Sequence, residues 1–276
     1  MRVAVVWHVE WISFARVDHV PAAGEIVHAA EHWEEPGGGG AVAAVQLAKL
    51  AGACDFFTAL GRDDLGSRAA RELRELGATL HVVTRDARTR QAITFVDPSG
   101  ERTITTLGDR LEPRADDDLP WEMLAATDAV YVCAADAAAF RKARLERTMV
   151  VTSRVAEQLA ASGVRADAVV GSARDPSERY DAAALAERPG LVVLTEGANG
   201  GTFETAEGDR GRFPAAPLPG PLADAYGGGD SFAAGLTFAF GRGRSVAESL
   251  AVAARCGAAC VAGTGPYEGQ LTAVDL

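Results

Sequence analysis

The sequence predicts an α/β fold in which helices cover both faces of a doubly wound, mostly parallel β-sheet. Short runs rich in Val, Ile and Leu alternate with Ala-rich segments of helical length along most of the chain. Two segments, at about 12–35 and 88–110, instead alternate polar and apolar residues and interrupt that pattern. We therefore expect a single domain over 1–276 that carries a small β-sheet as a lid.

Composition narrows the class of protein. The 276 residues are 48% hydrophobic and 24% charged, which is typical of a soluble globular protein with a full core. The net charge of −11 argues against nucleic acid or an acidic membrane as a partner. The sequence has no signal peptide and no apolar run of about 18 residues, so we expect a cytoplasmic protein. Cys256 and Cys260 are interpreted as small core residues because no further metal ligands join them.

The first third of the chain begins with a buried strand at 2–7, and the polar and aromatic cluster 8–11 follows at its carboxyl end. Ligands of open α/β sheets bind beyond such strand ends. Residues 14–33 are predicted to form short strands around a proline and a glycine. The segment 91–107 is predicted to be a hairpin with its turn at 97–100. These two segments would build the lid.

The remaining elements follow the alternation of strand and helix. A strand, a turn and a helix are predicted after the glycine-initiated helix at 37–52. The predicted strands are 54–61, 128–134, 148–153, 167–173 and 190–197, and the predicted helices are 67–77, 137–147, 156–162, 182–187 and 246–263.

Three consecutive glycines, Gly227, Gly228 and Gly229, precede Asp230 and an apolar helical segment. Glycines let an anion approach the backbone without meeting a Cβ, and the first turn of a helix has unpaired N–H groups. A carboxylate in that turn could take a proton from a hydroxyl group held beside a bound phosphate. The pattern predicts phosphoryl transfer to an alcohol. A plain helix cap is the alternative, because Asp is common at helix starts.

The segment 224–235, DAYGGGDSFAAG, resembles the D-T-x-G-A-G-D-x-F-x-x-G signature of the ribokinase-like (phosphofructokinase B type) carbohydrate kinases. The resemblance extends over most of the chain. It implies a ribokinase-like fold in which the three glycines form an anion hole and Asp230 is the catalytic base. Ala225 replaces the usual Thr, so the need for the monovalent cation that some relatives bind nearby stays open.

The acceptor side departs from the family pattern. Trp7, Glu10 and Ile12 occupy the positions of Gly, Asn and Asp in G-x-x-N-x-D, and Val42 replaces the Asn of G-G-x-x-A-N. The substrate-binding residues that the resemblance implies are Glu10, Trp11, Gly38 and Gly39, with Trp7 or Trp11 stacking on a sugar ring. A surface glutamate and two core tryptophans are the alternative. The changed residues predict an acceptor other than ribose, either another sugar or a nucleoside.

The segments expected on the nucleotide side also match the family pattern only in part. The segment 195–201, TEGANGG, resembles the T-x-G-x-x-G that relatives place against nucleotide phosphates, and Ser172 to Asp175 falls where relatives carry N-x-x-E. The resemblance implies that Asp175 acts on magnesium through water. The nucleotide-binding residues it implies are Asp224, Thr195, Gly197, Gly200 and Ser172.

Together these observations predict an ATP-dependent kinase that uses Mg²⁺ and phosphorylates a hydroxyl group of a small sugar or sugar-like alcohol. One alternative is a non-catalytic binder of nucleotide or sugar with the same fold. Another is a serine esterase that uses Ser231 as nucleophile, which the position of all five histidines in the first third of the chain disfavours. Pairing of lids between two subunits is common in the family, so we expect a homodimer.

Overall fold

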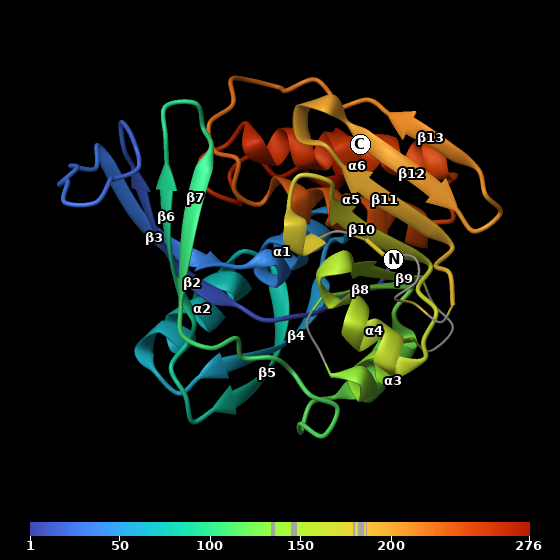
Figure 1. Cartoon of the computed structure of the whole chain (residues 1–276). Coiled ribbons are helices and arrows are strands. Elements are labelled where there is room, and N and C mark those ends of the chain that lie inside the picture. The colour runs from blue at the N-terminus through green and yellow to red at the C-terminus, as the bar shows by residue number, and fades with distance from the viewer. Residues whose placement is uncertain (134–135, 145–147, 179, 182–184, 186) are drawn as a thin grey trace.

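The computed structural model describes residues 1–276 except 134–135, 145–147, 179, 182–184 and 186 (Figure 1). A large sheet with helices on both faces forms the body, and a second, smaller sheet stands at one side of it (Figure 1).

The large sheet has nine strands in the order β13-β12-β11-β10-β9-β8-β1-β4-β5. Pairing is parallel from β11 to β5, while β12 and β13 are antiparallel, which confirms the mostly parallel sheet. The strands are β1 (Val3–Val6), β4 (Cys54–Gly61), β5 (Ala78–Arg85), β8 (Ala129–Val132), β9 (Thr148–Thr152), β10 (Ala168–Ser172), β11 (Leu191–Thr195), β12 (Gly201–Thr205) and β13 (Arg210–Phe213). The sequence analysis did not predict β5, β12 or β13.

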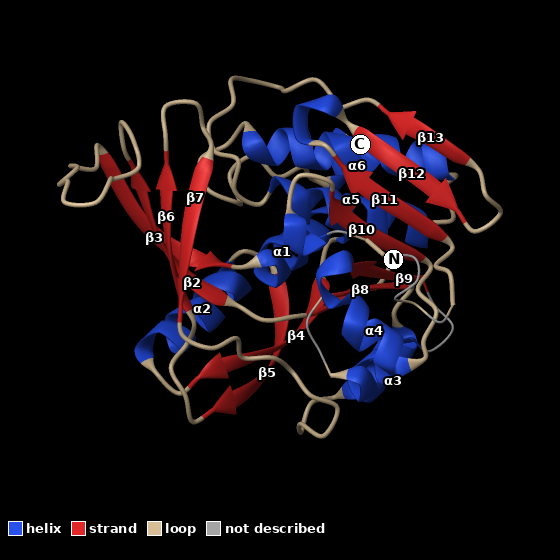
Figure 2. Cartoon of the chain, viewed as in Figure 1, coloured by secondary structure: helices blue, strands red, loops and turns tan. Residues whose placement is uncertain are grey.

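Helices cover both faces of this sheet and enclose two apolar cores (Figure 2). One face carries α1 (Gly39–Ala51), α2 (Asp64–Glu75), α5 (Gly228–Gly241) and α6 (Val246–Val261), and the other carries α3 (Ala137–Arg144) and α4 (Ala156–Ser162). Helix α2 starts three residues before its predicted start because the Asp63 carboxylate accepts a hydrogen bond from Gly66 N. The helix predicted at 182–187 lies largely outside the described residues.

The small sheet, which we define as β3-β2-β6-β7, joins two distant parts of the chain. Its strands are β2 (Glu10–Arg16), β3 (Glu31–Gly37), β6 (Gln91–Val96) and β7 (Arg102–Leu107). The hairpin turn predicted at 97–100 is confirmed by the bond from Gly100 N to Asp97 O. The short strands predicted within 14–33 are present at its two ends, in β2 and β3, whereas the described residues 17–30 contain no strand, since Pro21 lacks an N–H and Gly24 adopts a φ of +84°.

The carboxyl end of β1 marks the place where ligands are expected. Strand β1 pairs with β4 on one side and with β8 on the other, so the sheet is wound in both directions from this point. Such a switch point leaves a crevice beyond the strand ends. Trp7, which follows β1, and Asp230, at the start of α5, both lie against Gly39, and β2 of the small sheet begins at Glu10. Of the helices that the structure describes, none has the length and apolar character needed to cross a membrane.

Candidate active site

The glycine turn forms the N-terminus of α5. Gly227 precedes the helix with a φ of +80°, a conformation that favours glycine, and no side chain caps the helix at this position. A Cβ at Gly228 would lie 2.5 Å from Val261 Cγ1, whereas a Cβ at Gly229 would meet no atom within 4 Å. The first-turn N–H groups of a helix have no intrahelical partner and lie at the positive end of its dipole. The turn can therefore hold an anion in the open space at Gly229.

Asp230 lies in the first turn of α5, beside the N-terminus of α1. A Cβ at Gly39 would overlap Asp230 Oδ1, so glycine is what allows this close approach. The pKa of Asp230 is raised to about 6, and burial is the largest cause. The Glu178 carboxylate also raises this pKa, by more than Glu10 does, whereas Arg102 and Arg154 lower it. A carboxylate with a pKa near neutrality suits general-base catalysis.

The predicted acceptor residues Glu10, Gly38 and Gly39 lie together next to Asp230. Glu10 is only 8% exposed, and its Oε1 lies 3.1 Å from His8 Nε2 and 3.0 Å from Arg90 Nε. A Cβ at Gly38, whose φ is +82°, would lie 3.3 Å from Glu10 Cγ. Burial raises the pKa of Glu10, but the contacts with His8 and Arg90 lower it by more, so the side chain is a carboxylate.

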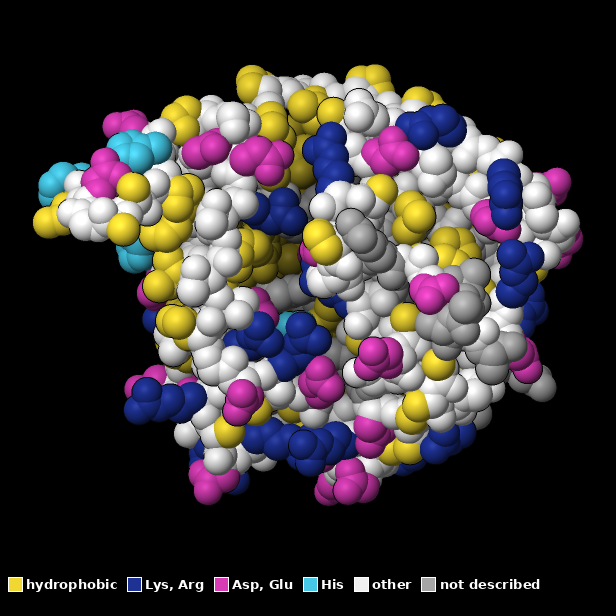
Figure 3. All heavy atoms as spheres, in the orientation of Figure 1, with side chains coloured by type: hydrophobic (Ala, Val, Ile, Leu, Met, Phe, Trp, Pro, Cys, Tyr) yellow, Lys and Arg dark blue, Asp and Glu magenta, His cyan; other side chains and the backbone are white. Residues whose placement is uncertain are grey.

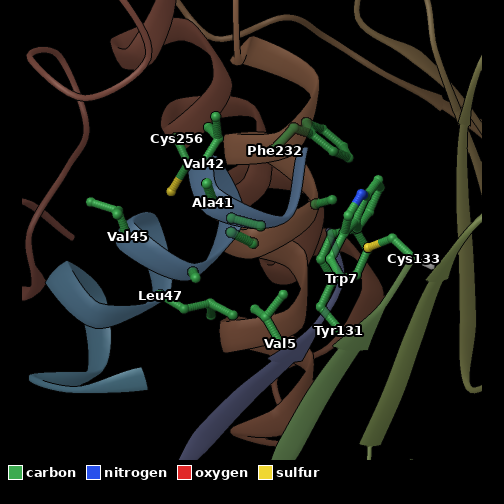
Figure 4. Close-up of a cluster of buried hydrophobic side chains, with 14 of the residues drawn as sticks. Val5, Trp7, Ala41, Val42, Val45, Leu47, Tyr131, Cys133, Phe232 and Cys256 are labelled. Carbon is green, nitrogen blue, oxygen red and sulfur yellow. The ribbon is translucent and has the colours of Figure 1, made fainter. Parts of the chain in front are cut away.

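His8 and Trp7 present one unpaired polar atom each at this end of the sheet. Burial lowers the pKa of His8 to about 4, so its ring is neutral. Because Glu10 is ionised, His8 Nε2 carries the proton of their hydrogen bond, and His8 Nδ1 is a buried acceptor without a partner among the residues that the structure describes. Trp7 Nε1 is a buried donor without a partner. Figure 4 shows the Trp7 indole beyond the strand ends, with its nitrogen turned away from the sheet.

The Trp11 side chain does not lie with the acceptor residues around Asp230. Its side chain projects from β2 toward α2, where the Arg68 guanidinium lies 4.2 Å from the ring centroid, and the residue is 1% exposed. Adjacent residues of a strand point to opposite faces, so Glu10 and Trp11 cannot both face the same ligand. We correct the stacking role predicted for Trp11, which is a core tryptophan.

Several predicted nucleotide-side residues lie together at the carboxyl ends of β10 and β11. Ser172 and Thr195 are directly paired in the ladder, and Ala173 N donates to Thr195 O over 2.9 Å. Gly197 and Gly200 follow with φ values of +63° and +75°. A Cβ at Gly197 would lie 2.9 Å from Arg174 Nη1, so a cationic side chain adjoins this turn. A nucleotide role for these residues stays a prediction.

Two predicted carboxylates have structural roles. Asp224 is fully buried, and its oxygens accept from Tyr226 N at 2.8 Å and from Gly265 N at 3.3 Å, so it shapes the backbone before the glycine turn and is not open to a nucleotide. Asp175 accepts from Arg154 Nη2 at 2.5 Å and from Ser177 N at 2.8 Å. Asp175 is thus held by Arg154 and Ser177, and its predicted action on magnesium through water stays a prediction.

The esterase alternative fails on the position of Ser231. The residue is fully buried within α5, and its Oγ accepts a hydrogen bond from Gln270 Nε2 at 3.3 Å. A nucleophile must be reached by its substrate and by a general base. Cys256 and Cys260 are both fully buried, which agrees with core roles.

The sequence analysis missed four charged residues that face the site. Glu178, Arg154 and Arg102 act on Asp230, and Arg90 acts on Glu10. Arg154 lies two residues after the end of β9, and its place after a buried parallel strand was a signal that could have identified it. Figure 3 shows Lys or Arg side chains around a hollow between the small sheet and the body. In the candidate site, the carboxyl groups of Asp230 and Glu10 are thus accompanied by arginines.

Solved structures with the same architecture are known. A microbiome-derived acarbose kinase superimposes with a TM-score of 0.83 at 22% identity, over 99% of this chain and 97% of that one. Ribokinase from Arabidopsis thaliana, solved with ribose and ATP, has a TM-score of 0.76 at 18% identity, over 99% and 96%. The chain therefore has the fold of the ribokinase class of kinases.

Comparisons of sequence narrow this class to a family. A family model described as pfkB family carbohydrate kinase matches residues 1–167 and 162–273. The chain belongs to this family and is a kinase. The aminoimidazole riboside kinase of Salmonella typhimurium is 29% identical over 281 residues, which cover 86% of this chain and 86% of that protein.

Proposed function

We propose that this protein is an ATP-dependent kinase that phosphorylates a hydroxyl group of a neutral sugar or nucleoside. The observation that carries the proposal is the position of Asp230, which lies in the first turn of α5 between the uncapped glycine turn and the acceptor residues Glu10 and Gly39. A base beside an anion site is the arrangement that phosphoryl transfer to an alcohol needs.

Each group has one task in this reaction. Asp230 takes the proton from the acceptor hydroxyl as it attacks the γ-phosphorus, and the bond from that phosphorus to the bridging oxygen of ADP breaks. The N–H groups at Gly227 to Gly229 stabilise the charge on the transferred group. Mg²⁺ would neutralise phosphate charge when bound. Glu178 is the carboxylate whose charge acts most strongly on Asp230, and both Glu178 and Asp175, which share Arg154, could hold the ion through water.

The unpaired atoms of the acceptor site favour a neutral, hydroxyl-rich molecule. His8 Nδ1 needs a donor, and Trp7 Nε1 needs an acceptor. A hydroxyl group supplies both, whereas a carboxylate or phosphate group offers no donor to His8. The likeness to a riboside kinase supports nucleosides as acceptors beside free sugars.

The small sheet would close over the acceptor and exclude water that otherwise competes for the phosphoryl group. Its edge strand β7 is exposed at every residue and carries Ile104 and Leu107, which are 39% and 45% exposed. Such an edge suits pairing with a second copy. We propose a homodimer through this sheet, and light scattering of the purified protein tests it; a monomer at micromolar concentration would exclude it.

A coupled ADP-release assay tests the reaction. Mg²⁺-ATP is supplied with a panel of sugars and nucleosides, in potassium and in sodium buffer, with wild type beside Asp230→Asn. We expect turnover with at least one acceptor and a loss of about 10²- to 10⁴-fold in kcat for the variant, with ATP binding retained. ATP binding without turnover would favour the non-catalytic binder, for which the pinned Asp175 is the motivating observation. Failure to bind ATP would refute the kinase assignment of this site.

A further inference from the structure

The backbone that leads into the glycine turn is held by the small sheet. Arg102 Nη1, at the start of β7, donates to Ala225 O over 2.9 Å, and Ala225 N donates to Gly100 O over 2.8 Å. Arg16 Nη1, on β2, donates to Ala223 O over 3.2 Å. The two carbonyls that flank Asp224 therefore both accept from arginines of the small sheet. A shift of this sheet must move the glycine turn or break these bonds.

Arg102 also brings a positive charge to the reaction site. Among the described residues its hydrogen bond goes to a backbone carbonyl and not to a carboxylate, so no ion pair neutralises it. It lowers the pKa of Asp230 more than any other cation does, and it also lowers that of Asp224. Arg154, the other cation near Asp230, belongs to the body and is tied to Glu178 at 2.7 Å.

The other groups around Asp230 do not supply this effect. Glu178 and Glu10 raise its pKa. The hydroxyl and thiol groups that interact with it stay uncharged, because burial raises the pKa of each one; they are Tyr131, Cys133, Tyr226, Cys260 and Tyr267. Arg16 acts on Asp224 and is not among the charges that shift Asp230. Arg102 is thus the one positive charge acting on Asp230, among the described residues, whose place depends on the small sheet; Glu10, at the start of β2, lies on the same sheet and acts in the opposite direction.

We propose that Arg102 is a positioning residue that couples closure of the small sheet to activation of the site: through Ala225 it fixes the glycine turn, and its charge keeps the Asp230 carboxylate ionised. The proposal rests on the proposed function. It means that, while the small sheet covers the acceptor and burial raises the pKa of Asp230, the charge of Arg102 offsets part of that rise. An open site would lose the hydrogen bonds that hold the glycine turn from the small sheet.

Three variants test this proposal. Arg102→Met removes the charge and the bond, Arg102→Lys restores the charge, and Arg16→Met breaks the equivalent bond to Ala223 without a charge effect on Asp230. The readout is the pH dependence of kcat/KM from pH 5 to 9. We expect Arg102→Met to move the acid limb of the pH profile to higher pH by about one unit. Arg102→Lys should return the limb most of the way to its wild-type position, and Arg16→Met should leave the limb where it is in wild type. Circular dichroism checks folding; Arg102 and its strand are exposed, so the substitution is tolerable.

A second measurement needs no turnover. The carboxyl ¹³C resonance of Asp230, identified by its loss in Asp230→Asn, is titrated in wild type and in both Arg102 variants. A higher midpoint in Arg102→Met supports the proposal. An unchanged midpoint would overturn the proposal. The proposal would also fail if Arg102→Met and Arg16→Met lost equal amounts of kcat while the acid limb of the pH profile did not move. Absence of any turnover in wild type would instead count against the proposed function, and the titration would still decide the role of Arg102.

Discussion

At the scale of single residues, the charge state of Asp230 decides when the proposed reaction can run. Its pKa is raised to about 6, and only the ionised form accepts a proton. We expect kcat/KM to fall below pH 6 and to level off above it, so activity is lost as the pH drops through this value. A pH series with saturating Mg²⁺-ATP measures this limb. A limb near pH 4 would show that the site leaves the carboxylate unperturbed.

Trp7 and Trp11 form a matched pair for testing the acceptor site. Both indole nitrogens are buried and unpaired, but only Trp7 lies beside Gly39 and Asp230. Trp7→Phe should raise the KM for the acceptor about 5- to 10-fold, the value of one hydrogen bond, with little change in the KM for ATP. Trp11→Phe should leave both constants unchanged. Equal effects of the two substitutions would remove Trp7 from acceptor recognition.

At the scale of elements, the glycine turn offers two neighbouring positions with opposite constraints. Gly229→Ala places its Cβ in open space, so we expect the free energy of unfolding to change by less than about 1 kcal/mol. The same methyl group occupies the space assigned to the transferred phosphate, so kcat should fall about 100-fold or more. Thermal unfolding and the ADP-release assay together measure both effects.

Gly228→Ala provides the contrast, because its Cβ would press on Val261 Cγ1 and should destabilise α5 against α6. A fully active Gly229→Ala enzyme would argue that the phosphate does not lie at this turn.

Elements differed in how well the sequence predicted them. Strands with continuous apolar runs, such as β1 and β10, and the Ala-rich helices were predicted near their actual bounds, because they are buried on both sides or along a wide face. Strand β5 has a mixed burial pattern at a sheet edge, and β12 and β13 are short, polar and antiparallel. Edge strands receive little of the core, so their composition carries a weak signal.

Residues of the candidate site could be placed together from the sequence only where motif and local geometry coincide. Asp230 and the glycines could be identified because the turn and the helix start are adjacent in sequence. Arg102 and Glu178 could not, since their proximity to Asp230 depends on the packing of three separate segments. Trp11 was assigned to the wrong side because strand β2 begins at Glu10, which turns the next side chain toward α2.

At the scale of the whole molecule, the contact between the small sheet and the body contains a pH-sensitive carboxyl group. Glu35, on β3, accepts from Trp33 Nε1 at 2.9 Å and lies near Asp224, and burial raises its pKa to about 7. The pKa of Glu35 is higher in the folded protein than its value near 4.5 in the unfolded chain. The contribution of Glu35 to the free energy of unfolding is therefore complete below pH 4.5 and is lost as the pH rises through 7.

Glu35→Gln should therefore raise the free energy of unfolding at pH 8 by more than about 1 kcal/mol and flatten its decline between pH 5 and 8. Glu34→Gln is the control, since Glu34 is exposed on the same strand. Urea unfolding at several pH values measures both. A decline of equal slope in Glu35→Gln would place the pH sensitivity elsewhere.

Because the sheet is wound in two directions from β1, the residues assigned to the acceptor and those assigned to the nucleotide come from different parts of the chain. The residues that face the acceptor, from Trp7 to Arg90, precede position 110, and the anion turn and the strand ends assigned to the nucleotide follow position 170. On the proposed function, the residues that select the alcohol lie in the first stretch and those that transfer the phosphoryl group lie in the second, with the bond from Arg102 to Ala225 O joining the two. Library mutagenesis of the first stretch that leaves Arg102 in place would then be expected to exchange the acceptor while the second stretch is inherited intact.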